Sequence, residues 1–316
     1  MKPMNAIRLL NRFINGYRFN QISKRKKFEP EKAILLFCDP RGGSTWLSEI
    51  LQQNLKVSLI WEPLHVGQNP NFEKIGFGYR QYIPEDAEWA EAKSQFENSF
   101  SGRSLNSWTT SKTSIDEMKD ADQLMIKFCR GHLLLPWLIQ NFDFDFHPIH
   151  FVRHPLAVLA SMLRHTDWDG VSNASYPIPD GRYNSIYLEH KEFLDSLTSR
   201  EEVLLTTWCI CNQYLLSHKW CNKEWITITY EDMLLDPLKE VERIKKRWGL
   251  GDSWDISSIR KPSSTTLKGS PSEVAERLSY WKDYFTDNQL DAFDRIFKYF
   301  KLDLYTFEFK PRYCFE

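Results

Sequence analysis

Short apolar runs alternate along the chain with longer segments in which apolar residues recur three or four positions apart. Short runs bounded by turn residues are typical of buried parallel strands, and the longer spacing is typical of helices. The runs predict strands at 33–38, 57–61, 124–128, 147–152 and 225–229. Strands that alternate with helices in this way predict an α/β fold, with a central parallel sheet and helices on both faces.

The periodic segments predict helices near 46–51, 132–140, 155–163, 184–197, 201–219, 237–248, 272–285 and 287–300. Two stretches, 62–120 and 166–183, lose this periodicity and gather glycine, proline and polar residues. Ligands of parallel sheets bind outside the carboxyl ends of the strands, and loops there commonly set specificity. We therefore expect the two stretches to border a ligand crevice.

A strand, a glycine-rich turn and a helix start follow one another in the segment AILLFCDPRGGSTWLSEILQQ. Gly42 and Gly43 favour a tight turn, and Ser44 or Thr45 is expected to cap the helix. The free backbone N–H groups of a helix start form an anion site. A nucleotide-hydrolase loop would carry a lysine before the hydroxyl residues, whereas the one cation of this turn is Arg41.

A second candidate anion site lies in the segment HPIHFVRHPLAVLASML, where a strand is followed by a proline at a helix start. Arg153 stands at the end of the strand and Ser161 lies eight residues further on. The planar, permanently charged guanidinium suits a phosphate. The plainer alternative is an arginine that closes a strand end and a serine on a helix surface.

Three segments in order carry a family resemblance: Pro-Arg-x-Gly-Ser-Thr-Trp at 40–46, Arg-x-Pro-(x)5-Ser at 153–161, and Tyr-Glu-Asp-Met at 230–233. Between about residues 33 and 300 the chain resembles sulfotransferases that use 3'-phosphoadenosine 5'-phosphosulfate (PAPS). The resemblance implies a P-loop-like three-layer fold. It also implies PAPS as co-substrate, no metal, and transfer of a sulfuryl group to a hydroxyl of an acceptor.

The resemblance also implies roles for single residues. Arg41 would lie near the bridging and sulfonate oxygens. The 5'-phosphate would be held by Gly42, Gly43, Ser44 and Thr45, and the 3'-phosphate by Arg153 and Ser161. Trp46 is either an adenine contact or a core residue, Tyr230 is a weaker cofactor contact, and Ser263, Ser264 and Lys268 form either a lid or a solvated loop.

Two residues are candidates for the base. Glu62, in Glu62-Pro63-Leu64, resembles the glutamate of carbohydrate sulfotransferases and ranks first. His132 lies near the place of the catalytic histidine in cytosolic small-molecule sulfotransferases and ranks second. Lys127 and Arg130 are expected to hold sulfonate or an anionic acceptor. Glu62 could instead only cap a helix or pair with an arginine.

The Glu62-Pro63-Leu64 segment favours a carbohydrate acceptor over a small alcohol, a phenol or a lipid. A nucleotide-binding module without turnover is an alternative of a different class. A small-molecule kinase is disfavoured, since no lysine precedes Ser44 and no aspartate for Mg²⁺ is evident.

Composition indicates the compartment in which the protein is expected to lie. The chain has 316 residues and a net charge of −1, and its six cysteines show neither a C-x-x-C pair nor zinc-finger spacing. A reducing, cytoplasmic location is the simplest expectation. No apolar run approaches the ~18 residues of a spanning helix.

Residues 1–32 hold nine Lys or Arg against two Glu and precede a sulfotransferase domain expected at 33–316. Apolar residues from Ile7 to Tyr17 recur there at helical spacing, with arginines offset from them. Such a helix can touch an anionic membrane surface through residues 1–27, or pack its apolar stripe on the body. Nucleic-acid binding is not favoured, because the basic run is short and the rest of the chain is acidic.

Overall fold

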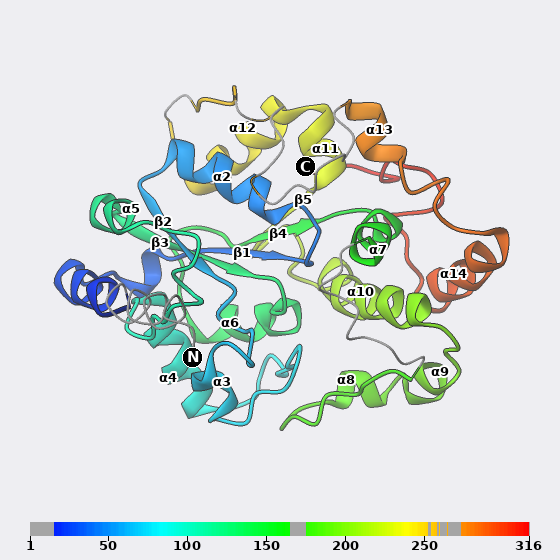
Figure 1. Cartoon of the computed structure of the whole chain (residues 1–316), viewed down its shortest axis with the longest axis horizontal. Helices are drawn as coiled ribbons and strands as arrows, with labels where there is room; N and C mark the ends of the chain where they lie inside the picture. The colour runs from blue at the N-terminus through cyan, green and yellow to red at the C-terminus, as the bar shows by residue number, and fades with distance from the viewer. Residues whose placement is uncertain are drawn as a thin grey trace, which may run out of the picture.

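A five-stranded parallel sheet lies at the centre of the computed structural model, which describes residues 16–164, 175–251, 254–257, 259, 264 and 273–315 (Figure 1). The strands are β1 (Ile34–Cys38), β2 (Val57–Trp61), β3 (Gln123–Phe128), β4 (Ile149–Val152) and β5 (Ile226–Thr229). Their order across the sheet is β2-β3-β1-β4-β5. All five predicted strands are therefore confirmed.

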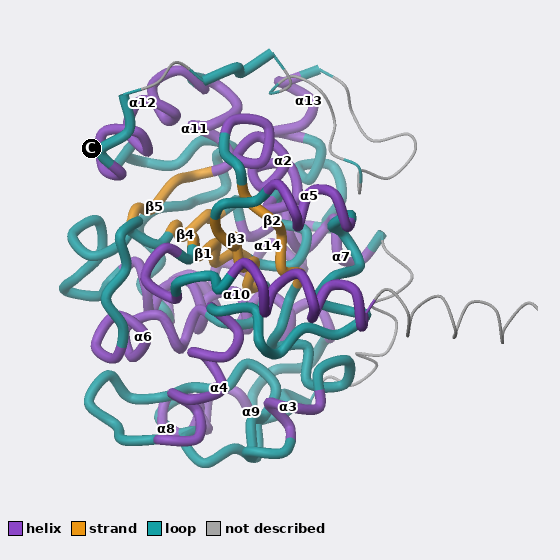
Figure 2. The backbone as a smooth tube through the Cα atoms, turned by 90° about the vertical axis from the view of Figure 1, so that its left-hand side faces the viewer, coloured by secondary structure: helices purple, strands orange, loops and turns teal. Residues whose placement is uncertain are grey.

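Helices cover both faces of the sheet (Figures 1 and 2). On one face lie α2 (Ser44–Asn54), α11 (Tyr230–Leu235) and α12 (Pro237–Trp248). On the other lie α4 (Ala90–Phe100), α6 (Leu135–Asn141) and α10 (Arg200–Leu216). The predicted three-layer α/β fold is confirmed.

Successive side chains of β1 belong to two different hydrophobic cores, one on each face of the sheet. Ile34, Leu36 and Cys38 are buried in the cluster under α2, while Leu35 and Phe37 are buried in the cluster under α4 and α6. Successive side chains of a strand point to opposite faces, so an unbroken apolar run is required when both faces are covered.

The remaining helices of the described residues are η1 (Pro30–Lys32), α3 (Pro70–Glu73), α5 (Ile115–Asp120), η2 (His132–Leu134), α7 (Pro155–Leu163), α8 (Ser185–Leu188), α9 (Lys191–Asp195), α13 (Val274–Ser279) and α14 (Asp287–Tyr299). The expectation that 62–120 is irregular was wrong for α3, α4 and α5. In α4 the buried residues Ala92, Phe96 and Phe100 do recur every four positions. Polar residues dominate between them, so the sequence pattern is weak.

The carboxyl ends of the strands bring the expected site loops to one edge. Phe37 pairs with His150 and Cys38 with Phe151, so β1 and β4 end side by side. Trp61 pairs with Lys127, which places the end of β2 beside the end of β3. The residues that follow these strands are Asp39, Arg153, Glu62 and Cys129, within or next to the segments singled out in the sequence.

Residues 16–26 form a helix that packs on the body. Phe19 is 4% exposed and joins the core cluster of Phe28 and Leu35. The Ser23 hydroxyl donates to the carbonyl of Gly102 at 2.7 Å. Most of the expected apolar stripe falls in residues 1–15, which lie outside the described residues. None of the helices in the described ranges is long and apolar enough to cross a membrane.

Phe19→Ala should destabilise the whole protein, because the ring is part of the central core. Phe-to-Ala changes in cores cost about 3 to 5 kcal/mol. Tyr17→Ala is the matched control, since Tyr17 is 62% exposed on the same helix and surface changes stay within about 0.5 kcal/mol. Urea unfolding measures both, and equal effects would show that this helix is not part of the cooperative unit.

Candidate active site

The loop between β1 and α2 is a tight turn built on left-handed residues. Arg41 has φ +65° and Gly43 has φ +92°. The N–H of Gly42 donates to the carbonyl of Asp39 at 2.9 Å, which closes the turn. A Cβ on Gly42 would lie 2.9 Å from that carbonyl oxygen, and one on Gly43 would lie 2.6 Å from the ring of Tyr230. The loop therefore needs glycine at both positions.

The start of α2 has no side-chain cap. Its N-cap is Gly43, which makes no capping hydrogen bond, so the expectation that Ser44 or Thr45 caps the helix was wrong. The glycine is required there because only it fits beside Tyr230 with positive φ. The first turn contains no acidic residue. A helix start without a cap, over a glycine turn, presents its N–H groups to an anion.

The two motifs expected to bind phosphate meet at this loop. The Nε of Arg41 donates to the hydroxyl of Ser161 at 3.1 Å, although the residues are 120 positions apart. Nη1 of Arg153 donates to the carbonyl of Arg41 at 3.1 Å. Arg41, Arg153 and Ser161 thus form one cluster at the ends of β1 and β4.

This cluster carries two guanidinium groups side by side. Burial lowers the pKa of Arg41, and the neighbouring charge of Arg153 lowers it further. Arg153 lies over the ring of Tyr230, with its guanidinium carbon 4.2 Å from the ring centre. Its Nε is buried and has no hydrogen-bond partner within the described ranges. Two facing cations with an unused donor form a cradle suited to a polyanion.

A buried glutamate fixes the turn that carries Arg153. Glu231 accepts from the N–H of His154 at 3.0 Å and from the hydroxyl of Tyr305 at 2.7 Å. Burial raises the pKa of Glu231 to about 7. Glu231 therefore ties the end of β4 to α11 and to the C-terminal segment. Sequence reasoning singled out the Tyr230–Met233 segment without this role for Glu231.

Glu62 lies at the end of β2 between two cations. Nη1 of Arg130 donates to Oε2 of Glu62 at 2.6 Å, and Nζ of Lys127 lies 3.7 Å from Oε1. Burial by itself raises the pKa of Glu62, but the charges of Lys127 and Arg130 outweigh it and hold the pKa below its ordinary value. Lys127 also donates to the hydroxyl of Thr45 at 3.2 Å. A chain of contacts thus links Glu62 to the first turn of α2.

His132 has different surroundings. It is 1% exposed, and neither ring nitrogen has a hydrogen-bond partner among the residues described. Burial, and then the charge of Arg80, put its pKa well below the ordinary value. Its Nε2 lies 3.8 Å from a carboxylate oxygen of Asp39, beneath the loop. The geometry gives His132 a place in the core and does not favour it as a base.

His132 belongs to a buried polar network that the sequence did not reveal. Asp39 pairs with Arg80 at 3.3 Å and accepts from Asn212 at 2.6 Å, and Asn212 contacts Nε2 of His150 at 3.0 Å. These residues come from β4, α10 and two loops, one of them directly after β1, so no local spacing connects them. The nearest signal is positional, because Asp39 directly follows the strand that leads to the loop.

Trp46 and Tyr230 pack against each other, and Tyr230 lies beside Gly43 of the loop. Trp46 is 3% exposed, and its indole N–H donates to the carbonyl of Ile259 at 2.9 Å. Its ring lies 5.3 Å from that of Tyr230, whose hydroxyl accepts from Arg277 at 2.6 Å. Of the two alternatives for Trp46, this arrangement favours the core residue over an exposed adenine platform.

Part of the expected lid lies outside the described residues, namely Ser263 and Lys268. The N–H of Ser264 donates to the carboxylate of Glu49 on α2 at 3.1 Å. Within the described ranges, no three histidine, cysteine, aspartate or glutamate residues lie together as a metal site would require.

Comparison with known proteins gives one family match and several similar structures. A family model described as the sulfotransferase domain matches residues 31–306. No curated protein sequence matches the chain significantly.

Among solved structures, mouse sulfotransferase SULT7A1 complexed with PAP is 16% identical (86% of this chain, 85% of that chain, TM-score 0.44). The sulfotransferase domain from the curacin biosynthetic pathway is 14% identical (85% and 98%, TM-score 0.40). That from the Synechococcus PCC 7002 olefin synthase is 17% identical (87% and 96%, TM-score 0.40).

Gly43→Ala should damage the loop beyond the strain of a left-handed alanine. That strain costs about 1 to 2 kcal/mol, and the new Cβ must also displace the Tyr230 ring 2.6 Å away. Gly76→Ala is the matched control, because Gly76 has φ +86° and nothing within 4 Å of an added Cβ. Thermal unfolding should show a larger loss of stability for Gly43→Ala. Only this variant should lose affinity for 3'-phosphoadenosine 5'-phosphate (PAP). Equal losses in both variants would mean that contact with Tyr230 does not constrain the loop.

Proposed function

Because the chain belongs to the sulfotransferase family, whose domain model matches residues 31–306, we propose that this site moves a sulfuryl group from PAPS to a hydroxyl of an acceptor. The observation that carries the proposal is the meeting of Arg41, Ser161 and Arg153 beside the uncapped start of α2. A donor with phosphates at both ends of its ribose needs two anion sites that lie close together. The cluster and the helix start supply them.

The two sites are proposed to divide the phosphates. The backbone N–H groups at Gly43, Ser44 and Thr45 would hold the 5'-phosphate, since they belong to the uncapped first turn. Arg153 and Ser161 would hold the 3'-phosphate, and the unused Nε of Arg153 is the donor available for it. The ring of Tyr230 lies under the guanidinium of Arg153 and would hold Arg153 in place.

In the proposed transfer, the acceptor oxygen forms a bond to sulfur while the bond from sulfur to the bridging phosphate oxygen breaks. The acceptor proton passes to a base, and PAP leaves. Arg41 and Lys127 would stabilise charge on the sulfuryl and bridging oxygens, because Arg41 lies three residues before α2 and Lys127 donates to Thr45 in its first turn. Fixed cations can do this work, so we expect a metal chelator to leave turnover intact.

Glu62 is the proposed base. Its carboxylate stays ionised because Lys127 and Arg130 lower its pKa, and it follows the end of β2, beside Lys127 of β3. A lowered pKa weakens a base, so Glu62 would accept the proton only as the bond to sulfur forms. Lys127, which contacts both Glu62 and Thr45, would connect the base to the phosphate loop.

We propose that the acceptor is a hydroxyl compound, either a carbohydrate or a small alcohol, phenol or lipid. The Glu62-Pro63-Leu64 segment favours a carbohydrate. A nucleotide-binding module without turnover is the alternative of a different class. Measured transfer from labelled PAPS separates it from an enzyme.

The protein should bind PAP far more tightly than AMP, because AMP has no group for Arg153 and Ser161. A hydrogen bond to a charged group contributes about 1.5 to 3 kcal/mol, or roughly 10- to 150-fold in affinity. Calorimetry measures both ligands. Equal affinities would exclude the proposed 3'-phosphate site.

Arg41→Ala should retain most of the affinity for PAP, which has no sulfonate, while kcat falls about 100-fold or more, as for loss of an oxyanion donor. Single-turnover rates with labelled PAPS and calorimetry with PAP measure the two effects. Arg25→Ala, on the helix of residues 16–26 away from the site, serves as the control. If Arg41→Ala turns over within a few-fold of wild type, another cation stabilises the transition state.

Glu62→Gln should lower kcat by about 10² to 10⁴, the usual contribution of a positioned base, without loss of PAP affinity. With Glu62 as base, activity is lost only as pH falls through its pKa, which lies below the ordinary 4.5. kcat should therefore stay level from about pH 8 down to about pH 5. His132→Gln tests the second candidate. A near wild-type kcat for Glu62→Gln beside an inactive, folded His132→Gln would reverse the assignment.

A further inference from the structure

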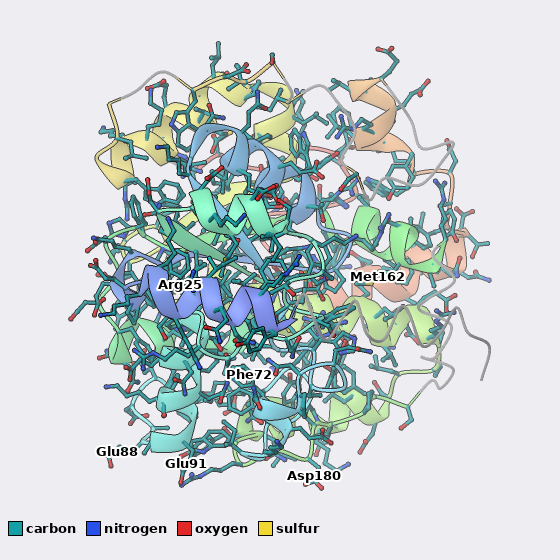
Figure 3. All side chains as sticks on the ribbon, turned by 60° about the vertical axis from the view of Figure 1, so that its left-hand side comes forward. Arg25, Phe72, Glu88, Glu91, Met162 and Asp180 are labelled. Carbon is teal, nitrogen blue, oxygen red and sulfur yellow. The ribbon has the colours of Figure 1, made fainter. Side chains whose placement is uncertain are left out.

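The turn between β4 and α7 carries Arg153, the residue proposed to hold the 3'-phosphate, and two distant parts of the fold hold this turn. The N–H of His154 donates to Glu231 of α11 at 3.0 Å. Nε2 of the His154 ring lies 2.9 Å from the carbonyl of Thr306 and donates to it, while Nδ1 accepts from a backbone N–H of α7. The turn leads into α7, on which Met162 is labelled in Figure 3. The position of Arg153 thus depends on α11 and on the C-terminal segment.

The C-terminal segment also reaches the carboxylate of Glu231. Figure 1 shows this segment, in red, running from α14 back to α11. There the hydroxyl of Tyr305 donates to Glu231 at 2.7 Å. Glu231 is 2% exposed, and among the residues described it forms no ion pair. Hydrogen bonds and the nearby charge of Arg153 are therefore what favours its ionised form.

The effects on this carboxyl nearly balance. Burial raises the pKa of Glu231 to about 7, although the hydrogen bonds from His154 and Tyr305 and the charge of Arg153 act to lower it. A carboxyl with a pKa near neutrality responds to any change in nearby charge. If the charge of Arg153 were compensated by a ligand, Glu231 would bind a proton more tightly.

The groups in contact with Glu231 do not titrate in the same range. Burial lowers the pKa of His154 to about 3, so its ring is neutral. Burial, and then the charge of Glu231, raise the pKa of Tyr305 well above its ordinary value. The other charged groups near these residues are Asp232 on α11, Glu240 on α12, Arg277 on α13 and Lys282 after α13.

Binding of the donor would change the charge at Arg153. A phosphate monoester carries about two negative charges above about pH 6. At Arg153 the phosphate would compensate the guanidinium and add negative charge close to the buried carboxylate. Both changes disfavour the ionised form of Glu231.

We propose that Glu231 is a positioning residue that takes up a proton when the 3'-phosphate of the donor binds at Arg153. It holds the turn through the N–H of His154, and its proton makes the affinity for the donor depend on pH. This inference rests on the proposed function, since it concerns the proposed 3'-phosphate site. Because the bound protein holds more protons than the free protein, PAP affinity falls as pH rises above the pKa of Glu231 in the free protein.

Calorimetry of PAP binding from about pH 7 to about pH 9 tests this, because both phosphates of PAP keep their charge in that window. Affinity should fall across the window by up to about 10-fold per pH unit, the limit for one proton. Titrations in HEPES and in Tris, whose protonation enthalpies differ, count the protons directly. We expect uptake of about half a proton to one proton per PAP near pH 8. AMP, which has no 3'-phosphate, should show little uptake.

Glu231→Gln separates this role from a purely structural one. The neutral amide resembles the protonated carboxyl, so PAP affinity should vary less than about 2-fold across the window and should exceed that of wild type near pH 9. A purely structural role would instead lower the affinity at every pH. Tyr305→Phe removes a donor to the ionised form, so the loss of affinity should begin at a higher pH.

Glu240→Gln is the matched control. Glu240 is also a buried glutamate, 1% exposed on α12, but it is paired with Arg243. Its replacement should leave the pH dependence of PAP binding as in wild type. Circular dichroism establishes that each variant is folded.

The outcomes separate this inference from the proposed function. Failure of the wild type to bind PAP overturns both. PAP binding without proton uptake in the wild type, or a wild-type pH dependence in folded Glu231→Gln, overturns the inference alone. If Glu231→Gln does not fold, the proton count of the wild type and the shift in Tyr305→Phe decide, and an unshifted profile in folded Tyr305→Phe overturns the inference.

Discussion

The hydrogen bond from Arg153 to the carbonyl of Arg41 is the contact on which the site depends. It joins the end of β4 to the loop after β1, and so brings together two sequence segments that are more than 100 residues apart. The bond also occupies the carbonyl of a residue held at φ +65°. Because Arg153 is itself fixed between Tyr230 and the turn bound by Glu231, the orientation of the loop is set by the sheet and by α11 together.

Backbone strain collects around the same crevice. Six residues other than glycine have positive φ in the described ranges, and three of them are Arg41, Glu62 and Arg80. Arg41 and Glu62 follow strands, and each of the three side chains contacts a residue from another part of the fold. Left-handed conformations of this kind cost about 1 to 3 kcal/mol each and persist where the surroundings impose them. Here the partners that impose them are Ser161, Arg130 and Asp39.

The sequence was sufficient for the sheet and for the glycine turn before α2, because both depend on local patterns. An apolar run buried on two faces, as in β1, leaves an unbroken signature. Glycine next to a helix start has a steric cause that acts within a few residues. The helix cap was misplaced by one or two residues, since Gly43 is required there by Tyr230, which lies far away in the sequence.

Contacts between polar residues that lie far apart in the sequence could not be predicted. Asp39, Arg80, Asn212 and His150 touch through long-range contacts with no common spacing. The burial of His132, which is 1% exposed, could likewise not be predicted from its position along the chain. The ion pairs of Glu62 were anticipated only as an alternative, and the lowered pKa follows from Lys127 and Arg130 lying on the neighbouring strand and just after it.

The strand order has a consequence for synthesis of the protein. β1 is central, and its two neighbours are β3, ending at Phe128, and β4, ending at Val152. During translation the loop after β1 therefore leaves the ribosome long before either flanking strand exists. β1 and β2 are not adjacent in the sheet, so these two apolar strands do not pair with each other. The nascent chain must hold two unpaired apolar strands until β3 ends at Phe128, when about two fifths of the protein has been made, and chaperone binding in this period would protect it from aggregation.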